Sequence, residues 1–294
     1  MKSLFHQIRN IVENPCQIKS LTDSEKANAW ESTVSGILSS NQPLDPKPHD
    51  LPGPLIISLT SYAPRFPTLP LTLRCLLSQT MKPDKIMLWI AHEDKDNLTS
   101  EILTLRTSGL EIEFCSDIGS YKKIIPTLQN YPDHFIITAD DDIYYWPTWI
   151  EELITSWSDR KQDIVAHIVH RINLSDNQLP LEYHKWKLDY TNAYDPSPLN
   201  FATGAGGVLY PPKIFHHDIL DIHAFQSLCK NADDVWLYWM SSLNGSMVRR
   251  TLSKRKIQSW PSTQEKGLYR YNVIHGNDNA IKAMIKTYGF PGKA

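Results

Sequence analysis

The sequence predicts an α/β fold, a Rossmann-like three-layer sandwich with a mainly parallel central sheet and a short helical N-terminal extension. Three observations predict it. Short apolar runs alternate with helical patterns from residue 55 onward, which is typical of crossover units. A proline-rich stretch separates these runs from an earlier helical segment. The chain of 294 residues is 41% apolar and 21% charged, which is enough for a large buried core.

Charge and cysteine content exclude several classes of function. The formal net charge of -2 provides no basic field of the kind that attracts nucleic acid. No apolar run reaches the ~18 residues that a membrane span requires. Four widely spaced cysteines speak against a zinc knuckle and a disulfide framework, and we expect them to be small buried side chains: Cys16, Cys75, Cys115 and Cys229.

The first 50 residues are predicted to form a helical extension and a linker, and residues 51–294 are predicted to form the main domain. Five prolines between residues 43 and 54 forbid regular structure there. Near the N-terminus, apolar residues recur at helical spacing beside Lys2, His6 and Arg9. Two interpretations stay open. This helix packs on the domain or on a second copy in a homodimer, or it lies on a membrane surface.

The predicted strands are four short apolar runs with helices between them. We expect strands at residues 55–60, 85–91, 111–115 and 134–138. We expect helices at residues 69–79, 99–106 and 121–129, and a further helix from about residue 147. In sheets of this kind ligands bind beyond the carboxyl ends of the strands, so the chemistry is expected there.

The fourth predicted strand is followed by three consecutive acidic residues, Asp140, Asp141 and Asp142. Adjacent carboxylates repel one another unless a cation or a water-filled cleft offsets the repulsion. Mg²⁺ and Mn²⁺ prefer carboxylate oxygens and leave room for phosphate oxygens. Asp140 and Asp142 face the same side of an extended segment. The cluster therefore predicts a divalent metal site, with a solvated turn capping the helix near Pro147 as the alternative.

The acidic cluster resembles the Asp-x-Asp motif of GT-A glycosyltransferases, which ends a strand and holds a divalent ion on the donor diphosphate. The first predicted strand with Ser61, Tyr62 and Arg65 resembles the loop of that family that receives the nucleotide. The resemblance covers about residues 55–276 and implies a GT-A catalytic domain. An Asp-x-Asp motif alone is frequent by chance, so its weight comes from three further segments that follow in the expected order.

The first of these segments contains glycines and the second contains two acids. Gly206 and Gly207, within residues 204–207, resemble the glycine-rich loop under the donor sugar; the alternative is a bulge in a strand. Asp233 and Asp234 resemble the acidic pair that starts a helix under the acceptor, and the alternative is that both only cap the helix. The resemblance implies that Asp234, with Asp233 as its competitor, takes the proton of the attacking hydroxyl.

The last segment contains His275, which resembles the C-terminal histidine that completes the metal site in many GT-A enzymes. The resemblance thus implies a metal set of Asp140, Asp142 and His275, although a lone histidine is more often an ordinary surface or core residue. Aromatic side chains near the later motifs can stack on sugar rings, and we assign acceptor binding to Trp236 and Trp260.

The implied reaction is sugar transfer from a nucleotide diphosphate donor, with UDP-sugars favoured, to a carbohydrate or glycolipid acceptor. The cofactor is Mn²⁺ or Mg²⁺, a Lewis acid for the leaving diphosphate. Arg65, Lys122 and Lys123 are assigned to the phosphates or the nucleotide, together with Asp140 and Asp141; the alternative for the three cations is that they are ordinary solvated charges. The acidic pair implies inversion at the anomeric carbon.

Two rival functions remain. A sugar-nucleotide nucleotidyltransferase shares the sheet and the metal carboxylates, but its glycine-rich basic loop after the first strand is replaced here by SYAPRFPTLP. A non-catalytic carbohydrate-binding protein on the same fold is the second rival. By family analogy, the sequence predicts a cytoplasmic enzyme at the inner face of the membrane, in surface polysaccharide or lipopolysaccharide synthesis.

Overall fold

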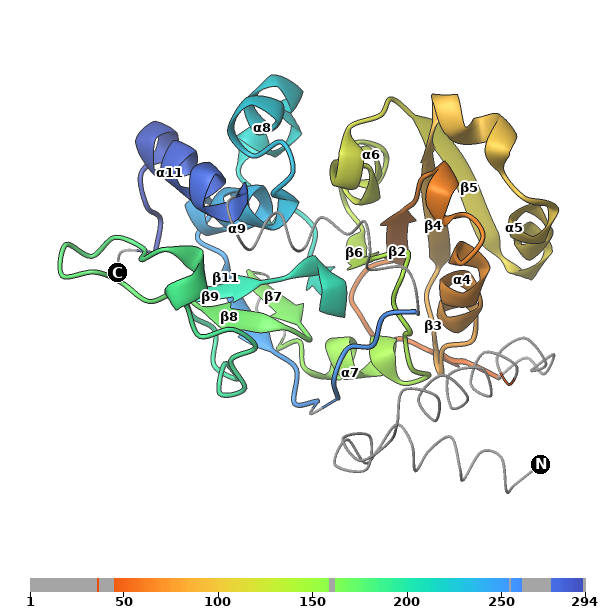
Figure 1. Ribbon diagram of the computed structural model, residues 1–294. Helices are drawn as coiled ribbons and strands as arrows, with labels where there is room; N and C mark the ends of the chain where they lie inside the picture. Colours follow the sequence, from red (N-terminus) through yellow and green to blue (C-terminus); the bar gives the residue numbers. More distant parts are fainter. Residues whose placement is uncertain (1–35, 37–44, 159–161, 254, 261–275, 293–294) are drawn as a thin grey trace, which may run out of the picture. The chain divides into compact units, whose positions relative to one another are not determined.

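The computed structural model describes residues 36, 45–158, 162–253, 255–260 and 276–292 (Figure 1). The chain divides into two units, Met1–Leu44 and Asp45–Ala294, and all of the elements named below belong to the second. The predicted N-terminal helices lie outside the described residues, except that Gly36 is helical.

A seven-stranded sheet forms the centre of the larger unit, in the order β11-β7-β10-β6-β2-β4-β5. Only β10 runs against its neighbours, β6 and β7, and the other pairs are parallel. The predicted α/β fold with a mainly parallel sheet is therefore confirmed. The strands are β2 (Leu55–Thr60), β4 (Lys85–Ala91), β5 (Leu110–Cys115), β6 (Phe135–Ala139), β7 (Asp163–Ala166), β10 (Val208–Tyr210) and β11 (Met247–Arg250).

The four predicted strands agree with β2, β4, β5 and β6 to within one residue at each end. Every residue of β6 is buried, as are five of the six residues of β2. Strands covered on both faces need apolar side chains at every position, not an alternating pattern. Continuous apolar runs are therefore the signal that made these strands predictable.

Helices connect the strands as expected, although several are shorter than predicted. The predicted helix at 121–129 is divided, because Pro126 is accommodated in the first turn of a helix and α6 therefore begins at Ile125. The helices are α4 (Leu69–Leu77), α5 (Ser100–Thr104), α6 (Ile125–Asn130), α7 (Trp149–Thr155), α8 (Ile222–Leu228), α9 (Asp233–Leu243) and α11 (Asn277–Tyr288). The 3-10 segments are η1 (Ala63–Arg65), η2 (His92–Asn97), η3 (Leu105–Ser108), η4 (Gly119–Lys123), η5 (Tyr183–Lys185), η6 (Gly204–Gly206) and η7 (His217–Leu220).

Two small sheets lie outside the central one. β8 (Val169–Arg171) pairs antiparallel with β9 (Asn200–Ala202). β1 (Lys47–Pro48) pairs parallel with β3 (Met81–Lys82), so the prediction that prolines exclude regular structure from the linker is wrong at this point. The N–H of Lys47 donates to the Thr80 carbonyl, whereas Pro48 stands at an edge where its missing N–H costs nothing.

The antiparallel strand β10 determines where the loop before it opens. Val208, its first residue, lies opposite Thr138 near the carboxyl end of β6. The segment preceding β10, which contains η6, therefore reaches the same edge of the sheet as the acidic residues after β6.

The core at the β11 side of the sheet is built around α9, whose residues 235–240 are all buried. Figure 1 shows α8, α9 and α11 grouped near this side, with α4 and α5 near the β4–β5 side. Within the part of the chain that the structure describes, no helix combines the length and the apolar character that a membrane crossing requires.

Two buried histidines are held neutral by their surroundings. His167 Nε2 lies 3.2 Å from the Trp149 carbonyl oxygen, so this nitrogen donates, and Nδ1 accepts from Thr251 Oγ1 at 3.1 Å. His170 Nδ1 accepts from the backbone N–H of Asp189. Burial lowers the pKa of each imidazole to about 4.

These two histidines should make the fold less stable in acid. Between pH 6.5 and 4 the unfolded chain binds protons that the folded chain does not, so stability falls as the pH falls through this range. Replacing either histidine with glutamine should reduce this loss by about 2 kcal/mol at pH 4.5, taking about 1.4 kcal/mol per pKa unit. Urea unfolding at pH 7 and 4.5 measures the difference. An identical pH dependence in both variants and the parent would contradict the prediction.

Candidate functional site

The predicted acidic cluster lies at the carboxyl end of β6, as expected. The backbone N–H of Asp140 donates to the Tyr145 hydroxyl at 2.8 Å, which fixes the start of the turn. Asp142 is buried, while Asp140 and Asp141 keep part of their surface. Asp140 pairs with Lys123, whereas Asp141 and Asp142 share Arg65, so two cations offset the repulsion among the three acids.

Asp141 and Asp142 are bound by the loop that follows β2. Ser61 Oγ donates to Asp141 Oδ2 at 2.5 Å, and Arg65 Nη1 lies 2.6 Å from Asp142 Oδ2 and 3.5 Å from Asp141 Oδ1. Burial raises the pKa of Asp141 to about 6, although Arg65 and Ser61 oppose that rise. Burial acts against the charge of Arg65, but the two carboxylates outweigh it and raise the pKa of the guanidinium. These contacts hold the loop after β2 against the acidic cluster, an association that the sequence did not predict.

Asp140 is bound by Lys123, which comes from η4, the segment after β5. The Lys123 ammonium lies 2.9 Å from Asp140 Oδ1 and 3.0 Å from Asp233 Oδ2. The side chain is only 7% exposed. Burial acts against its charge, but Asp140, Asp233 and Asp234 outweigh it and raise the pKa of Lys123. One buried cation thus joins two acidic segments that are more than 90 residues apart in the sequence.

The acidic pair occupies the first turn of α9 and does not cap it. The N-cap is Ala232, with no side-chain cap. The alternative that Asp233 serves only to cap the helix is therefore wrong, and its carboxylate is turned to Lys123 instead. Carboxylates in a first helical turn are stabilised by the positive end of the helix dipole, which helps to hold both acids together.

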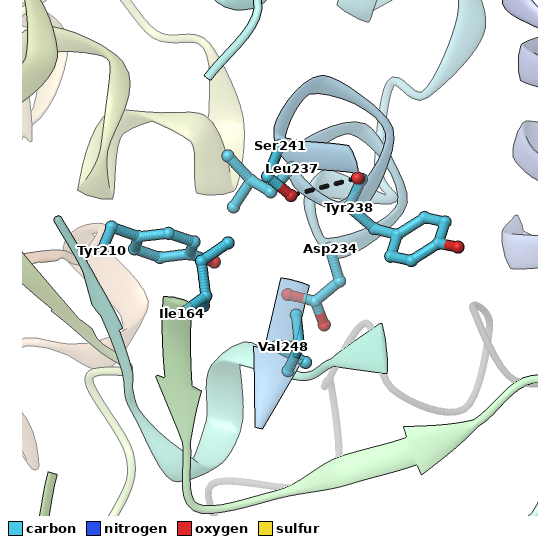
Figure 2. Close-up of a pocket in the computed structure, with 8 residues that line it drawn as sticks. Ile164, Tyr210, Asp234, Leu237, Tyr238, Ser241 and Val248 are labelled. Carbon is cyan, nitrogen blue, oxygen red and sulfur yellow. Dashed lines mark hydrogen bonds between the residues drawn. The ribbon is translucent and has the colours of Figure 1, made fainter. Parts of the chain in front are cut away.

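Asp234 extends from α9 toward the sheet and lines a small cavity (Figure 2). Its Oδ1 accepts from the backbone N–H of Gly204 at 3.0 Å. Burial, and next to it the charge of Asp233, raises the pKa of Asp234 to about 8. Most of its neighbours in the cavity are apolar: Ile164, Ala202, Tyr210, Leu237, Tyr238, Ser241 and Val248. A carboxyl group with its pKa this close to neutrality can both accept and release a proton at working pH.

The glycine loop meets the acidic residues, and close packing explains each glycine in it. A Cβ on Gly204 would lie 2.9 Å from Lys123 Nζ, and one on Gly206 would lie 2.9 Å from Ile168 Cγ1. Gly207 has a φ of +91°, and a Cβ there would lie 2.2 Å from the Trp149 ring. The alternative of a bulge does not describe this segment, since it is a 3-10 turn between β9 and β10.

Two aromatic residues connect the glycine loop to the acidic cluster. The indole N–H of Trp149 donates to the Gly206 carbonyl at 2.7 Å, and its ring packs on Tyr145 with 4.3 Å between centroids. Tyr145 in turn accepts from Asp140, as described above. Nothing in the sequence specifies this link, although the run of aromatic residues directly after the acidic cluster could have suggested it.

Two other predicted residues make different contacts. Lys122 is ion-paired with Asp117 and not with the carboxylates around Lys123. Tyr62 is 39% exposed, and its side chain is hydrogen-bonded to Arg65.

The two tryptophans assigned to acceptor binding are interior residues. Trp236 is 0% and Trp260 1% exposed, and their indoles donate to the Ile219 carbonyl and to Thr72 Oγ1. Neither ring offers a face to a sugar, so that assignment is corrected. The sequence pattern could not predict their burial, because a tryptophan in the core and a tryptophan on a substrate-binding surface can have the same sequence neighbours.

The oxygen ligands of the candidate site fit a hard divalent cation in kind. Five acidic side chains, Asp140–Asp142, Asp233 and Asp234, gather around two basic ones, Arg65 and Lys123, so acidic groups outnumber basic groups here. Mg²⁺ and Mn²⁺ prefer such oxygens. His275, the predicted third ligand, lies outside the described residues. Among those residues, the group of three ligand atoms within 4.8 Å of one another is His216, His217 and Asp218, which cap and brace η7.

Comparison with known proteins shows no match to any protein family and no match to a curated protein sequence. Solved structures give distant likenesses. S. aureus TarS 1-349 has a TM-score of 0.44 at 10% identity, over 70% of this chain and 60% of that one. Its complex with UDP has a TM-score of 0.45 at 12% identity, over 69% and 59%. The chain thus spans about three fifths of TarS 1-349.

A nucleotidyl-transferring enzyme gives a structural likeness of the same order. The inositol-1-phosphate CTP transferase from T. maritima has a TM-score of 0.39 at 9% identity, over 79% of this chain and 96% of that one. Scores at this level do not distinguish the two kinds of activity, so the function has to be argued from the site.

Gly207→Ala should destabilise the protein more than Gly109→Ala does. Both glycines have positive φ, but a Cβ on Gly109 meets nothing within 4 Å, so that variant isolates the cost of the backbone conformation. The clash with Trp149 should add a further ~1–3 kcal/mol. Chemical denaturation of the two variants and the parent provides the comparison, and equal losses would show that the Trp149 contact is unimportant.

Asp233→Asn and Asp234→Asn should change stability in opposite directions at pH 9. The first removes a partner of buried Lys123 and should destabilise the fold. The second removes a desolvated charge and keeps an acceptor for Gly204, so it should stabilise the fold by more than about 1 kcal/mol. Since the folded-state pKa of Asp234 is raised, the parent loses stability as the pH rises from about 4 to 8. The gain in Asp234→Asn should therefore vanish at pH 4.

Proposed function

We propose that this protein is a metal-dependent glycosyltransferase of the GT-A type that moves a sugar from a nucleotide diphosphate donor to a carbohydrate or glycolipid acceptor. One observation carries the proposal. The acids after β6, the acids that open α9 and the glycine loop before β10 meet around Lys123, and these are the segments that the family resemblance assigned to metal, acceptor and donor sugar.

The donor side of the proposed site is the loop after β2 together with the end of β6. Ser61 and Arg65 are already bound to Asp141 and Asp142, so the nucleotide-side residues and the metal-side residues form one constellation. The guanidinium of Arg65 is suited to bidentate recognition of a diphosphate. We assign Tyr62, exposed beside this loop, to the nucleotide base, and a UDP-sugar as donor.

Asp140 and Asp142 would hold the divalent cation, with His275 as the third ligand. A bound Mn²⁺ or Mg²⁺ supplies Lewis-acid stabilisation of the leaving nucleoside diphosphate. Arg65 is ion-paired with Asp142 and Lys123 with Asp140, so each of these two carboxylates already has one cationic partner. The excess of carboxylates over cations supports a further cation here.

On the acceptor side, Asp234 is the proposed general base. The acceptor oxygen forms a bond to the anomeric carbon as the bond to the diphosphate oxygen breaks, and the hydroxyl proton passes to the Asp234 carboxylate. Direct displacement of this kind inverts the anomeric configuration. With a pKa of about 8, Asp234 is a stronger base than an ordinary carboxylate. Asp233, bound to Lys123, is the less available of the two acids.

The biological setting extends the proposal by analogy with the family. We place the activity in surface polysaccharide or lipopolysaccharide synthesis, in the cytoplasm at the inner face of the membrane. A glycolipid acceptor would bring the protein to that surface. The nucleotidyltransferase rival requires a glycine-rich basic loop after the first strand, and the segment at that place, SYAPRFPTLP, contains no glycine.

A donor screen tests the proposal directly. The full chain, with Mn²⁺ or Mg²⁺ and a panel of nucleotide sugars, should release a nucleoside diphosphate, and Asp142→Asn and Asp234→Asn should each lower the rate by about 100-fold or more. Asp133→Asn, an exposed acid two residues before β6, is the matched control and should keep the parental rate. Release of pyrophosphate from a nucleoside triphosphate would favour the nucleotidyltransferase instead. Full activity in both site variants would refute the mechanism.

A further inference from the structure

Lys123 is the buried cation at the meeting point of the site, and its contacts go beyond those of an ordinary ion pair. Its ammonium touches Asp140 from the end of β6 and Asp233 from α9. Among the described residues no other lysine or arginine forms an ion pair with Asp140, Asp233 or Asp234. Within the described residues, Lys123 is therefore the cation that links Asp140 to the acidic pair of α9.

The glycine loop is fitted to the same ammonium. Gly204 has no side chain at the point where a Cβ would lie 2.9 Å from Lys123 Nζ and 3.2 Å from Asp234 Oδ1. Its backbone N–H donates to Asp234. A larger residue at position 204 would displace Lys123, Asp234 or both. The positions of the loop, the cation and the acid therefore depend on one another.

We propose that Lys123 is a positioning residue that sets the separation between the donor-side carboxylate Asp140 and the acceptor-side pair Asp233 and Asp234. This inference rests on the proposed function. Asp140 lies on the side of the metal and the diphosphate, and Asp234 on the side of the attacking hydroxyl. Lys123 thereby holds the leaving group and the base at a fixed distance from each other, which is the condition for in-line displacement.

Stability alone does not account for such a residue. A buried ammonium carries a large desolvation cost, and well-packed apolar side chains often replace buried ion pairs without loss of stability. Nearby tyrosine hydroxyls, those of Tyr121, Tyr145 and Tyr210, carry no positive charge in either protonation state and so cannot replace the ammonium. A positioning role would explain why this site contains a buried lysine despite its desolvation cost.

The kinetic test is Lys123→Met, which keeps the length of the side chain and removes its charge. We expect kcat to fall about 100-fold, as for an ångström-scale misplacement of reacting groups, while the KM for the donor changes by less than about threefold. Lys123→Arg should recover part of the loss. Lys85→Met, which removes another ion-paired lysine at the opposite end of the sheet, is the control and should retain the parental kcat. An unchanged kcat in Lys123→Met would overturn the proposal.

A test without substrate separates this inference from the proposed function. Asp140→Asn and Asp233→Asn are combined in the parent and in the Lys123→Met background, and urea unfolding is measured for each. Coupling through Lys123 predicts that the two changes are non-additive in the parent and additive once the lysine is removed. Additive effects in the parent would overturn the inference, even if the enzyme transfers sugar. Non-additivity in a protein that acts on no donor would uphold the linkage and reject the proposed function.

Discussion

Charge balance at the carboxyl end of β6 is the constraint on which the rest of the site depends. Five carboxylates gather there, and two cations, Arg65 and Lys123, hold them in place from opposite sides. Each cation comes from a loop that follows a parallel strand, β2 or β5. Because the carboxyl ends of parallel strands share one edge of the sheet, their loops deliver charges to a common point without long connections.

The sequence was sufficient for the parallel part of the sheet and for the identity of most of the polar residues at its edge. Apolar runs such as Leu55–Thr60 are recognisable because a strand buried on both faces carries apolar side chains at most positions, and its few polar residues, such as Ser58, are small. The three acids after β6 were recognisable because consecutive carboxylates directly after such a run have few structural roles. The acidic pair of α9 was recognisable only from the family resemblance, and Arg65 and Lys123 were candidates with ordinary solvated charges as the alternative. Partners were not recognisable: nothing in the sequence says that Lys123 faces Asp233, or that Lys122 beside it turns away to Asp117.

Aromatic residues show where sequence patterns stop being informative. Trp236 and Trp260 are interior, whereas Trp149, in the same kind of apolar context, supports the Gly206 carbonyl and limits position 207 to glycine. The difference lies in tertiary packing, for example against Gly206 for Trp149 and against Thr72 for Trp260. Likewise, the sequence suggests that Gly207 provides a flexible backbone near a sugar, whereas in the structure the indole ring of Trp149 leaves no room for a side chain at this position.

The reversed strand β10 brings a second kind of segment to the functional edge of the sheet. In a purely parallel sheet, only segments that leave a strand can reach the functional edge, and segments that enter a strand open at the other end. Since Val208 lies opposite Thr138, the segment entering β10 opens at the functional edge as well. Its glycines pack against Lys123, Asp234 and Trp149, so this entry segment is coupled to the acids on both sides of it. A longer or bulkier segment would therefore shift the acids as well as the surface that it presents.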